Sequence, residues 1–261
     1  MDSVNKTLYI PLYGKAYVSR RGLFLTDRKA EEIWEKEGFP LKGKSKSKWL
    51  AYYMGMRAAV FDDWVRQQLA TDEGIVILHI GCGMDSRVER VDYRGHQWYD
   101  VDFPEVIQER KRYYGESPDY QMIPGDARQP DWLNRIPKGK RAVVILEGVS
   151  MYLTVPELKH LAMALSAHFE QLSLLLDHYT ILAAKLSRYK NPINDVGVTE
   201  VCGMDDPAEV EGDGLRFVEE QDITPEKYIL ELQGSERRIF RKLYAGKLSK
   251  KLYRMYAYQK I

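Results

Sequence analysis

Residues 74–105, GIVILHIGCGMDSRVERVDYRGHQWYDVDFPE, show in order a strand, a glycine turn, a short helix and a second strand. Ile75 to Leu78 form an apolar run rich in β-branched residues, which is typical of a strand buried on both faces. Gly81 and Gly83 follow, and glycine tolerates positive φ and lets a ligand approach the backbone closely. This order predicts a nucleotide-binding unit of an α/β sheet.

The second strand of this unit ends at Asp102, about 20 residues after the first glycine. At that spacing a carboxylate binds the ribose hydroxyls of a nucleotide. A dinucleotide site needs a third glycine, but Gly83 is followed by MDSR, residues 84–87. The missing glycine favours a ligand without a pyrophosphate, of which S-adenosylmethionine is the common example. On these residues alone, a turn that binds nothing is the alternative.

The composition is ordinary for a soluble globular protein. The 261 residues are 44% hydrophobic and 30% charged, with a formal net charge of +1. This length suits one large domain, or one domain with an elaborated cap. The near-zero charge gives no global field toward nucleic acid or membrane, and no apolar run is long enough to span a bilayer. The first ten residues lack a signal-peptide core. We therefore expect a cytoplasmic protein with neither partner, and its oligomeric state stays open.

Cysteine and histidine show no metal-ligand spacing. There are two cysteines and five scattered histidines, so we expect no metal site. Cys82 lies near a predicted helix start, a position that lowers a thiol pKa, but a small residue that fills the turn is the favoured interpretation. The 18 tyrosines indicate either a pocket lined by amphipathic rings or ordinary packing.

The N-terminal quarter of the chain is predicted to be mostly helical. Asp27 is a good N-cap, and residues 49–69 place apolar side chains three and four positions apart on one face. Arg57 lies within this second helix. Its simplest role is a surface arginine or an ion pair with Asp62 or Asp63 nearby.

Strands and helices alternate from residue 74 onward. Further strands are predicted over residues 120–123, 141–146 and 172–176, and a helix over 156–169. Acidic residues stand at the strand ends, where open α/β sheets bind ligands; they are Asp102, Asp126, Glu147 and Asp177. Four acids at one edge repel one another unless something positive or rich in donors lies there. A sulfonium cofactor with an adenosine supplies both.

Two loops and a basic segment lie outside this pattern. The loop LKGKSKSK, residues 41–48, is interpreted as a solvated linker, with a lid over a ligand as the alternative. Residues 187–214 are rich in Asn, Asp, Gly and Pro and resemble an insertion or lid. Short strands are predicted over 215–218 and 252–258. Residues 237–254 carry eight Lys and Arg, which indicate a solvated helix face, or else a contact with an acidic partner or RNA.

Four motifs together resemble the leucine carboxyl methyltransferase superfamily, which includes bacterial polyketide O-methyltransferases of the tetracenomycin type. They are GCGMDSR (81–87), YDVDFPEV (99–106), GDAR (125–128) and EGVSMYL (147–153). The resemblance implies a Rossmann-like class I methyltransferase fold: a seven-stranded, mostly parallel sheet with the last strand antiparallel, and a helical cap. We expect one domain over residues 1–261, divided into a cap (1–70), a cofactor-binding core (74–180), a lid or insertion (181–215) and C-terminal strands with the basic segment (216–261).

The resemblance also implies S-adenosyl-L-methionine as cofactor and a role for each matching residue. Gly81 and Gly83 would pass under its methionine part, and Asp102 would hold the ribose hydroxyls. Asp126 and Ala127 would lie beside the adenine, where the family has Asp-Leu.

The remaining implied roles concern the methionine and acceptor ends. Glu147 would lie near the amino group of the cofactor, and Arg57 would bind its carboxylate as a bidentate fork, with Lys15 as a second basic residue. Met151 and Tyr152 would line the substrate side.

These features predict an S-adenosylmethionine-dependent O-methyltransferase that acts on a carboxylate, or a hydroxyl, of a small molecule. A carboxylate is ionised at neutral pH and needs no base, so we name no catalytic residue. A phenol would benefit from a base, and His178 is the nearest candidate, although a structural role is favoured. The alternatives are methylation of a protein C-terminus, a non-catalytic binding protein, or an oxidoreductase, which would need the absent third glycine.

Overall fold

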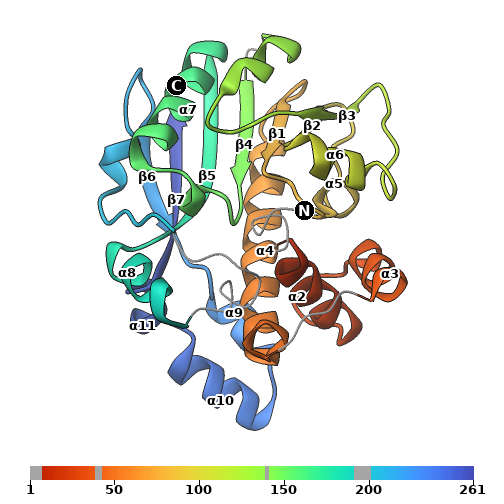
Figure 1. Ribbon diagram of the computed structural model, residues 1–261, viewed down its shortest axis with the longest axis vertical. Coiled ribbons are helices and arrows are strands. Elements are labelled where there is room, and N and C mark those ends of the chain that lie inside the picture. Colours follow the sequence, from red (N-terminus) through yellow and green to blue (C-terminus); the bar gives the residue numbers. More distant parts are fainter. Residues whose placement is uncertain (1–7, 39–42, 139–140, 191–200) are drawn as a thin grey trace.

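The structure is a computed structural model that describes residues 8–38, 43–138, 141–190 and 201–261. Its centre is a seven-stranded sheet in the order β3-β2-β1-β4-β5-β7-β6 (Figure 1). β7 runs antiparallel to both neighbours, and the pairs among β1 to β5 are parallel. The predicted sheet is confirmed. The strands are β1 Val76–Ile80, β2 Gln97–Asp102, β3 Tyr120–Pro124, β4 Arg141–Leu146, β5 Gln171–Tyr179, β6 Arg216–Gln221 and β7 Tyr253–Lys260.

The helices begin where the sequence provides N-caps. Asp27 Oδ1 accepts a hydrogen bond from Ala30 N at 2.8 Å, and Thr154 and Glu157 form a reciprocal capping box. The α-helices are α2 Tyr9–Arg20, α3 Arg28–Glu37, α4 Lys48–Leu69, α5 Arg87–Arg90, α6 Pro104–Arg110, α7 Val155–His168, α8 Ile181–Lys190, α9 Glu226–Ile229, α10 Gly234–Leu243 and α11 Lys247–Lys250. Short 3-10 helices are η1 Gly43–Lys46, η2 Pro130–Arg135, η3 Ser150–Tyr152 and η5 Pro207–Val210.

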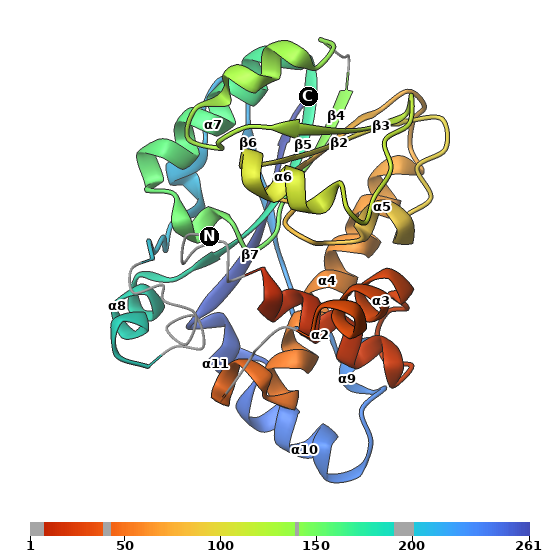
Figure 2. The same ribbon diagram turned by 45° about the vertical axis from the view of Figure 1, so that its right-hand side comes forward.

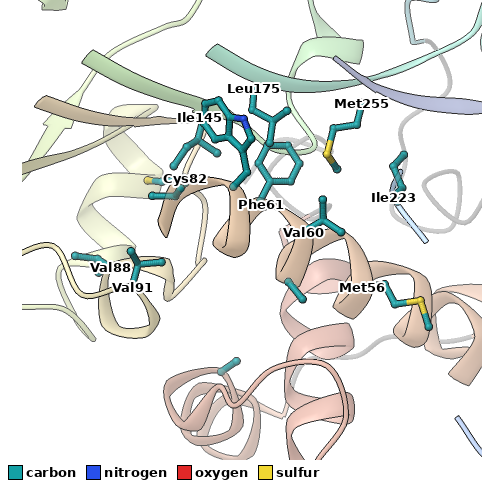
Figure 3. Close-up of a cluster of buried hydrophobic side chains, with 14 of the residues drawn as sticks. Met56, Val60, Phe61, Cys82, Val88, Val91, Ile145, Leu175, Ile223 and Met255 are labelled. Carbon is teal, nitrogen blue, oxygen red and sulfur yellow. The ribbon is translucent and has the colours of Figure 1, made fainter. Parts of the chain in front are cut away.

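The central strands are apolar on both faces because each face carries a separate core. In β4, Val143 and Ile145 pack on the side of α4, whereas Val144 and Leu146 pack on the side of α7. Figure 3 shows Phe61 of α4 beneath Ile145 and Leu175, with Met255 of β7 beside them. α4 therefore joins the sheet to the helices at the carboxyl edge of the strands.

The first helices form a cap beside that edge (Figure 2). α2 packs closely on α4 because small residues lie at the contact. A Cβ added at Gly55 would lie 2.7 Å from Val18 Cγ2. α2 and α4 thus present their side chains toward the ends of β1 and β4.

The fifth strand was predicted to end at Asp177, which is wrong: β5 continues to Tyr179 because the long β7 pairs with it through this region. The division into cap, core, lid and C-terminal segment stays a prediction, since residues 191–200 of the expected lid and 41–42 of the basic loop lie outside the described residues.

Candidate functional site

A cavity of about 600 Å³ lies between the cap and the carboxyl edge of the sheet. One end is formed by the glycine turn after β1 and by the start of the EGVSMYL segment after β4. The other end is formed by apolar and aromatic side chains of α4 and of the segment from α10 to β7. Each end has a distinct chemistry.

The glycine turn brings bare backbone to the cavity wall. Gly81 has φ of +67° and Gly83 has φ of +52°, a region that other residues adopt at a cost. A Cβ at Gly81 would lie 2.2 Å from Val149 Cγ2, so a side chain has no space there. Glycine at this position lets the turn pass tightly under the cavity.

Asp102 lies directly behind this turn. Its Oδ2 accepts a hydrogen bond from Gly83 N at 2.7 Å, and its Oδ1 accepts one from Phe103 N at 2.8 Å. Burial raises the pKa of Asp102 to about 6, and these two backbone donors only partly offset that effect. The carboxylate is therefore a strong acceptor that the protein leaves incompletely satisfied.

Asp126 and Ala127 follow β3 beside Asp102, where Gly125 N donates to Asp102 O at 2.8 Å. The carboxylate of Asp126 is bound by the guanidinium of Arg128, with Nη2 to Oδ2 at 2.6 Å. Burial opposes its ionisation, but the hydrogen bonds from Arg128 lower the pKa of Asp126. These two residues and Asp102 lie next to the cavity and do not form part of its wall.

Arg57 reaches from the cap to the acidic ends of β4 and β5. Its Nε donates to Glu147 Oε1 at 3.1 Å, and its Nη1 lies 3.2 Å from Asp177 Oδ2 and donates to Tyr253 OH at 3.1 Å. Burial alone would lower the pKa of Arg57, but Tyr253, Asp177 and Glu147 raise it well above its usual value. Nη2 has no hydrogen bond to any other described residue, so its donors remain available to a ligand.

The simpler interpretation of Arg57, an exposed side chain or an ion pair with Asp62 or Asp63, is wrong. Arg57 is 4% exposed, and Asp62 is instead bound by two other arginines, Arg87 and Arg90. Helical spacing alone could not show this, because the partners of Arg57 come from distant strands.

Lys15 of α2 forms a buried ion pair with the turn. Its Nζ lies 2.6 Å from Asp85 Oδ2, and Asp85 Oδ1 accepts a hydrogen bond from Arg87 N at 2.7 Å. Burial opposes the charge of Asp85, but Arg90, Lys15 and Arg87 hold its pKa well below the usual range. The N-terminal basic residue expected from the motif therefore lies at the cavity wall.

Glu147 is shared between Arg57 and Arg87. Burial would raise its pKa, but Arg87 and Arg57 lower it to about 2, so the side chain is ionised. The sequence predicted that the acidic edge needs positive charge, and the protein supplies part of it through these arginines. Two cations, Lys15 and Arg57, and two acids, Asp85 and Glu147, thus stand in the wall.

Few residues at the far end of the cavity were predicted from the sequence. Tyr53, Tyr152, Tyr179, Tyr244 and Tyr253 line it, which confirms the pocket suggested by the tyrosine content. Trp49 stacks on Tyr244 with ring centroids 5.7 Å apart and 10° between the planes. Apart from Tyr152, which lies in the EGVSMYL segment and was predicted there, no local motif marks these residues, because they converge from α4, β5 and the C-terminal segment. Met151 also reaches the wall.

Two candidates for reactive groups are structural. Cys82 is buried, and burial raises the pKa of its thiol well above the usual value, which confirms that it fills the turn. His178 is fully buried, and its Nδ1 lies 2.7 Å from Ser150 Oγ. Burial lowers its pKa to about 4, and it does not line the cavity.

The sequence profile of the leucine carboxyl methyltransferase family matches residues 5–165. The chain belongs to this family. Tetracenomycin polyketide synthesis O-methyltransferase TcmP of Streptomyces glaucescens is 27% identical over 241 residues, which are 91% of this chain and 89% of that protein. The S-adenosyl-L-methionine-dependent methyltransferase dpfgK of Gibberella zeae is 28% identical over 193 residues, which cover 67% of this chain and 65% of that one.

Solved structures share the fold of this leucine carboxyl methyltransferase family member. Magnesium protoporphyrin IX methyltransferase from Synechocystis PCC 6803 with bound SAH has a TM-score of 0.51 at 13% identity, covering 90% of this chain and 94% of that one. The [4+2]-cyclase SpnF has a TM-score of 0.50 at 13% identity, over 78% and 81% of the two chains. Because the second is named a cyclase, the site and not the fold must identify the reaction.

Two features are absent from the described residues. None of their helices is both long and apolar enough to cross a membrane. Among the same residues, no three His, Cys, Asp or Glu side chains are grouped to hold a metal ion.

Proposed function

We propose that this protein transfers a methyl group from S-adenosylmethionine to a carboxylate oxygen of an apolar small molecule. The observation that carries the proposal is the two-ended cavity, which joins paired cations and acids at a glycine turn to an aromatic end. A cavity of about 600 Å³ is of the size that holds small ligands. A zwitterionic cofactor suits the first end, and an apolar acceptor suits the second.

The residues present fit this cofactor. Gly81 and Gly83 leave backbone bare where a Cβ would fill the turn. The free Nη2 of Arg57 and the remaining donors of Lys15 Nζ suit the methionine carboxylate, and Asp85 and Glu147 suit its ammonium group.

Three residues behind the turn suit the adenosine. The partly satisfied carboxylate of Asp102 suits two ribose hydroxyls. Asp126 and Ala127 stand beside it, where the adenine would lie. When bound, the cofactor supplies an electrophilic methyl group.

The chain's own residues would align and protect the acceptor. The aromatic end, with Trp49, Tyr53 and Tyr244, excludes water and orients a flat apolar body. A carboxylate acceptor is already ionised at neutral pH, so no proton transfer is required. This agrees with the burial of His178 away from the cavity wall.

The first test is ligand-induced stabilisation. Adenosylhomocysteine is expected to raise the melting temperature and NAD is not, because a ligand that binds only the folded state stabilises it. Asp102→Ala is expected to abolish the rise and Arg57→Ala to weaken it. Asp92→Ala, at an exposed acid that does not line the cavity, is the control and should leave the rise intact. A protein unaffected by adenosylhomocysteine would overturn the proposal.

A second test identifies the acceptor. Carboxylic acids, phenols and peptides with free C-termini are each incubated with the protein and S-adenosylmethionine. The adenosylhomocysteine that forms is hydrolysed, and the homocysteine released is measured. Turnover of small acids alone supports the proposal. Turnover of peptides alone favours a protein carboxyl methyltransferase, and turnover of phenols alone contradicts the assignment of a carboxylate.

A further inference from the structure

A group of exposed cations borders the aromatic end of the cavity. We call Arg238, Lys242, Lys247 and Lys251 the basic rim; all four are exposed. Their side chains form no hydrogen bond or ion pair with another described residue, and only the backbone carbonyl of Lys251 accepts one from a side chain, Thr180 Oγ1, at 2.8 Å. Residues 234–254 contain eight Lys and Arg and one Glu, a net charge of +7, so the rest of the chain carries 1 − 7 = −6. The charge of this nearly neutral protein is therefore strongly segregated.

The other cations of this segment are engaged in the fold. Arg237 donates to the carbonyl of Leu232, and Arg241 pairs with Glu226. Lys250 and Arg254 both lie within 4.0 Å of Glu220. The single acid, Glu236, is bound by Lys48 and by Tyr52 OH. Glu220, Glu226 and Glu236 are thus already paired with other groups, and the four rim side chains stay exposed.

The rim belongs to the same short elements that close the cavity. Leu243, Tyr244, Ser249 and Leu252 line the cavity and alternate along the chain with rim residues. Leu243 is 52% exposed and Leu252 is 38% exposed, and side chains that both line a cavity and reach solvent lie at its opening. Figures 1 and 2 show α10 and α11 together at this end of the molecule.

We propose that the basic rim draws the ionised acceptor to the cavity and discriminates it from its neutral methyl ester. The inference rests on the proposed function. In the transfer, a carboxylate oxygen forms a bond to the methyl carbon, the carbon–sulfur bond breaks, and its electron pair stays on sulfur. The acceptor thereby loses its negative charge, and the sulfonium loses its positive one. The rim then no longer attracts the product, which favours its release.

The size of the effect follows from screened electrostatics. One unit charge about 10 Å from a univalent anion changes the association constant of that anion by about 1.7-fold in water at 10 mM salt. Three such charges change it by about fourfold. At 0.15 M salt the combined effect falls to about twofold, and at 1 M it disappears. Neutral ligands should show none of this dependence.

The test compares two probes that differ only in charge, anthracene-2-carboxylate and its methyl ester. Their binding is measured by fluorescence titration at 10 mM, 0.15 M and 1 M salt, with adenosylhomocysteine present. The rim variant changes Lys242, Lys247 and Lys251 to Gln. A matched control changes Arg135, Lys138 and Lys159 to Gln; these are also exposed, and none lines the cavity or lies on an element that does.

The rim variant is expected to bind the acid about fourfold more weakly than the parent at 10 mM salt, and equally at 1 M. Its affinity for the ester should not change, and the control should match the parent for both probes. Equal losses for acid and ester, equal losses in rim and control variants, or no saturable binding of the acid by the parent would overturn the inference. Stabilisation by adenosylhomocysteine in the same samples reports separately on the proposed function.

Discussion

Asp102 is expected to destabilise the protein at neutral pH, and Asp102→Asn is the perturbation that shows it. The pKa rises from an ordinary value of 3.8 to about 6 because the carboxylate is buried. Such a rise makes ionisation about 3 kcal/mol more costly in the folded chain than in the unfolded one. The stability is fully present below pH 3.8 and is lost as the pH rises through 6. Between pH 4.5 and 7.5 the loss is about 2 kcal/mol.

The asparagine variant removes this titration but keeps the shape of the side chain. One of the two backbone donors, Gly83 N or Phe103 N, then faces an amide NH2 group, which costs about 1–3 kcal/mol at every pH. Relative to the parent, the variant should therefore gain about 2 kcal/mol in free energy of unfolding when the pH is raised from 4.5 to 7.5. Other titrating groups cancel in this double difference.

The assay is urea denaturation of parent and variant at pH 4.5, 6 and 7.5 without ligand. Asp126→Asn is the control, since the pKa of Asp126 is lowered and its titration lies below this pH window. The control's difference from the parent should be flat. If the difference between Asp102→Asn and the parent is also flat within about 0.5 kcal/mol, the reasoning about the buried carboxylate is refuted.

Three further predictions concern the glycine turn, the cap arginine and the buried histidine. Gly81→Ala should cost clearly more than Gly95→Ala, because both have positive φ, worth about 1–2 kcal/mol, but only the first meets a valine side chain at 2.2 Å; thermal unfolding compares them, and equal losses would contradict the packing argument. Arg57→Ala should cost about 3–5 kcal/mol because it leaves two buried carboxylates without this partner, whereas Arg66→Ala at an exposed pair should cost under about 1 kcal/mol; urea denaturation at pH 7.5 tests this, and similar costs would show that the buried pairs are not intact. Burial lowers the pKa of His178 from 6.5 to about 4, so the protein loses stability as the pH falls below 6.5. Between pH 8 and pH 5 the parent should lose about 2 kcal/mol more free energy of unfolding than His178→Gln, and parallel dependences of the two on pH would rule this out.

Local patterns were sufficient for much of the fold. Apolar runs such as residues 141–146 predict strands because a strand covered by helices on both faces must be apolar throughout. Asp27 and residues 49–69 predicted helices correctly, since capping and helical periodicity act within a few residues. The end of β5 was misplaced because its last residues are held by β7, which lies far along the chain.

The end of the cavity proposed to hold the cofactor was also predictable from local motifs. Gly81, Gly83 and Asp102 lie in one strand–turn–strand unit, and their separation along the chain sets their separation in space. Arg57 and Glu147 were predicted to lie at this end as well, but their ion pair was not predicted. Its partners lie 90 residues apart, and only the packing of α4 against the sheet brings them together.

By itself, the sequence determined the family, the order of the strands along the chain with the acidic residues at their ends, and the type of ligand expected at the glycine turn. These features depend on short segments whose geometry is set locally. Tertiary structure alone decided how the buried charges are paired and which side chains surround the end of the cavity proposed for the acceptor. The buried acids are neutralised by arginines from other elements, and the aromatic wall and the basic rim come from α4 and the C-terminal segment. Such contacts depend on the packing of segments far apart in the chain, and no local pattern in the sequence indicates them.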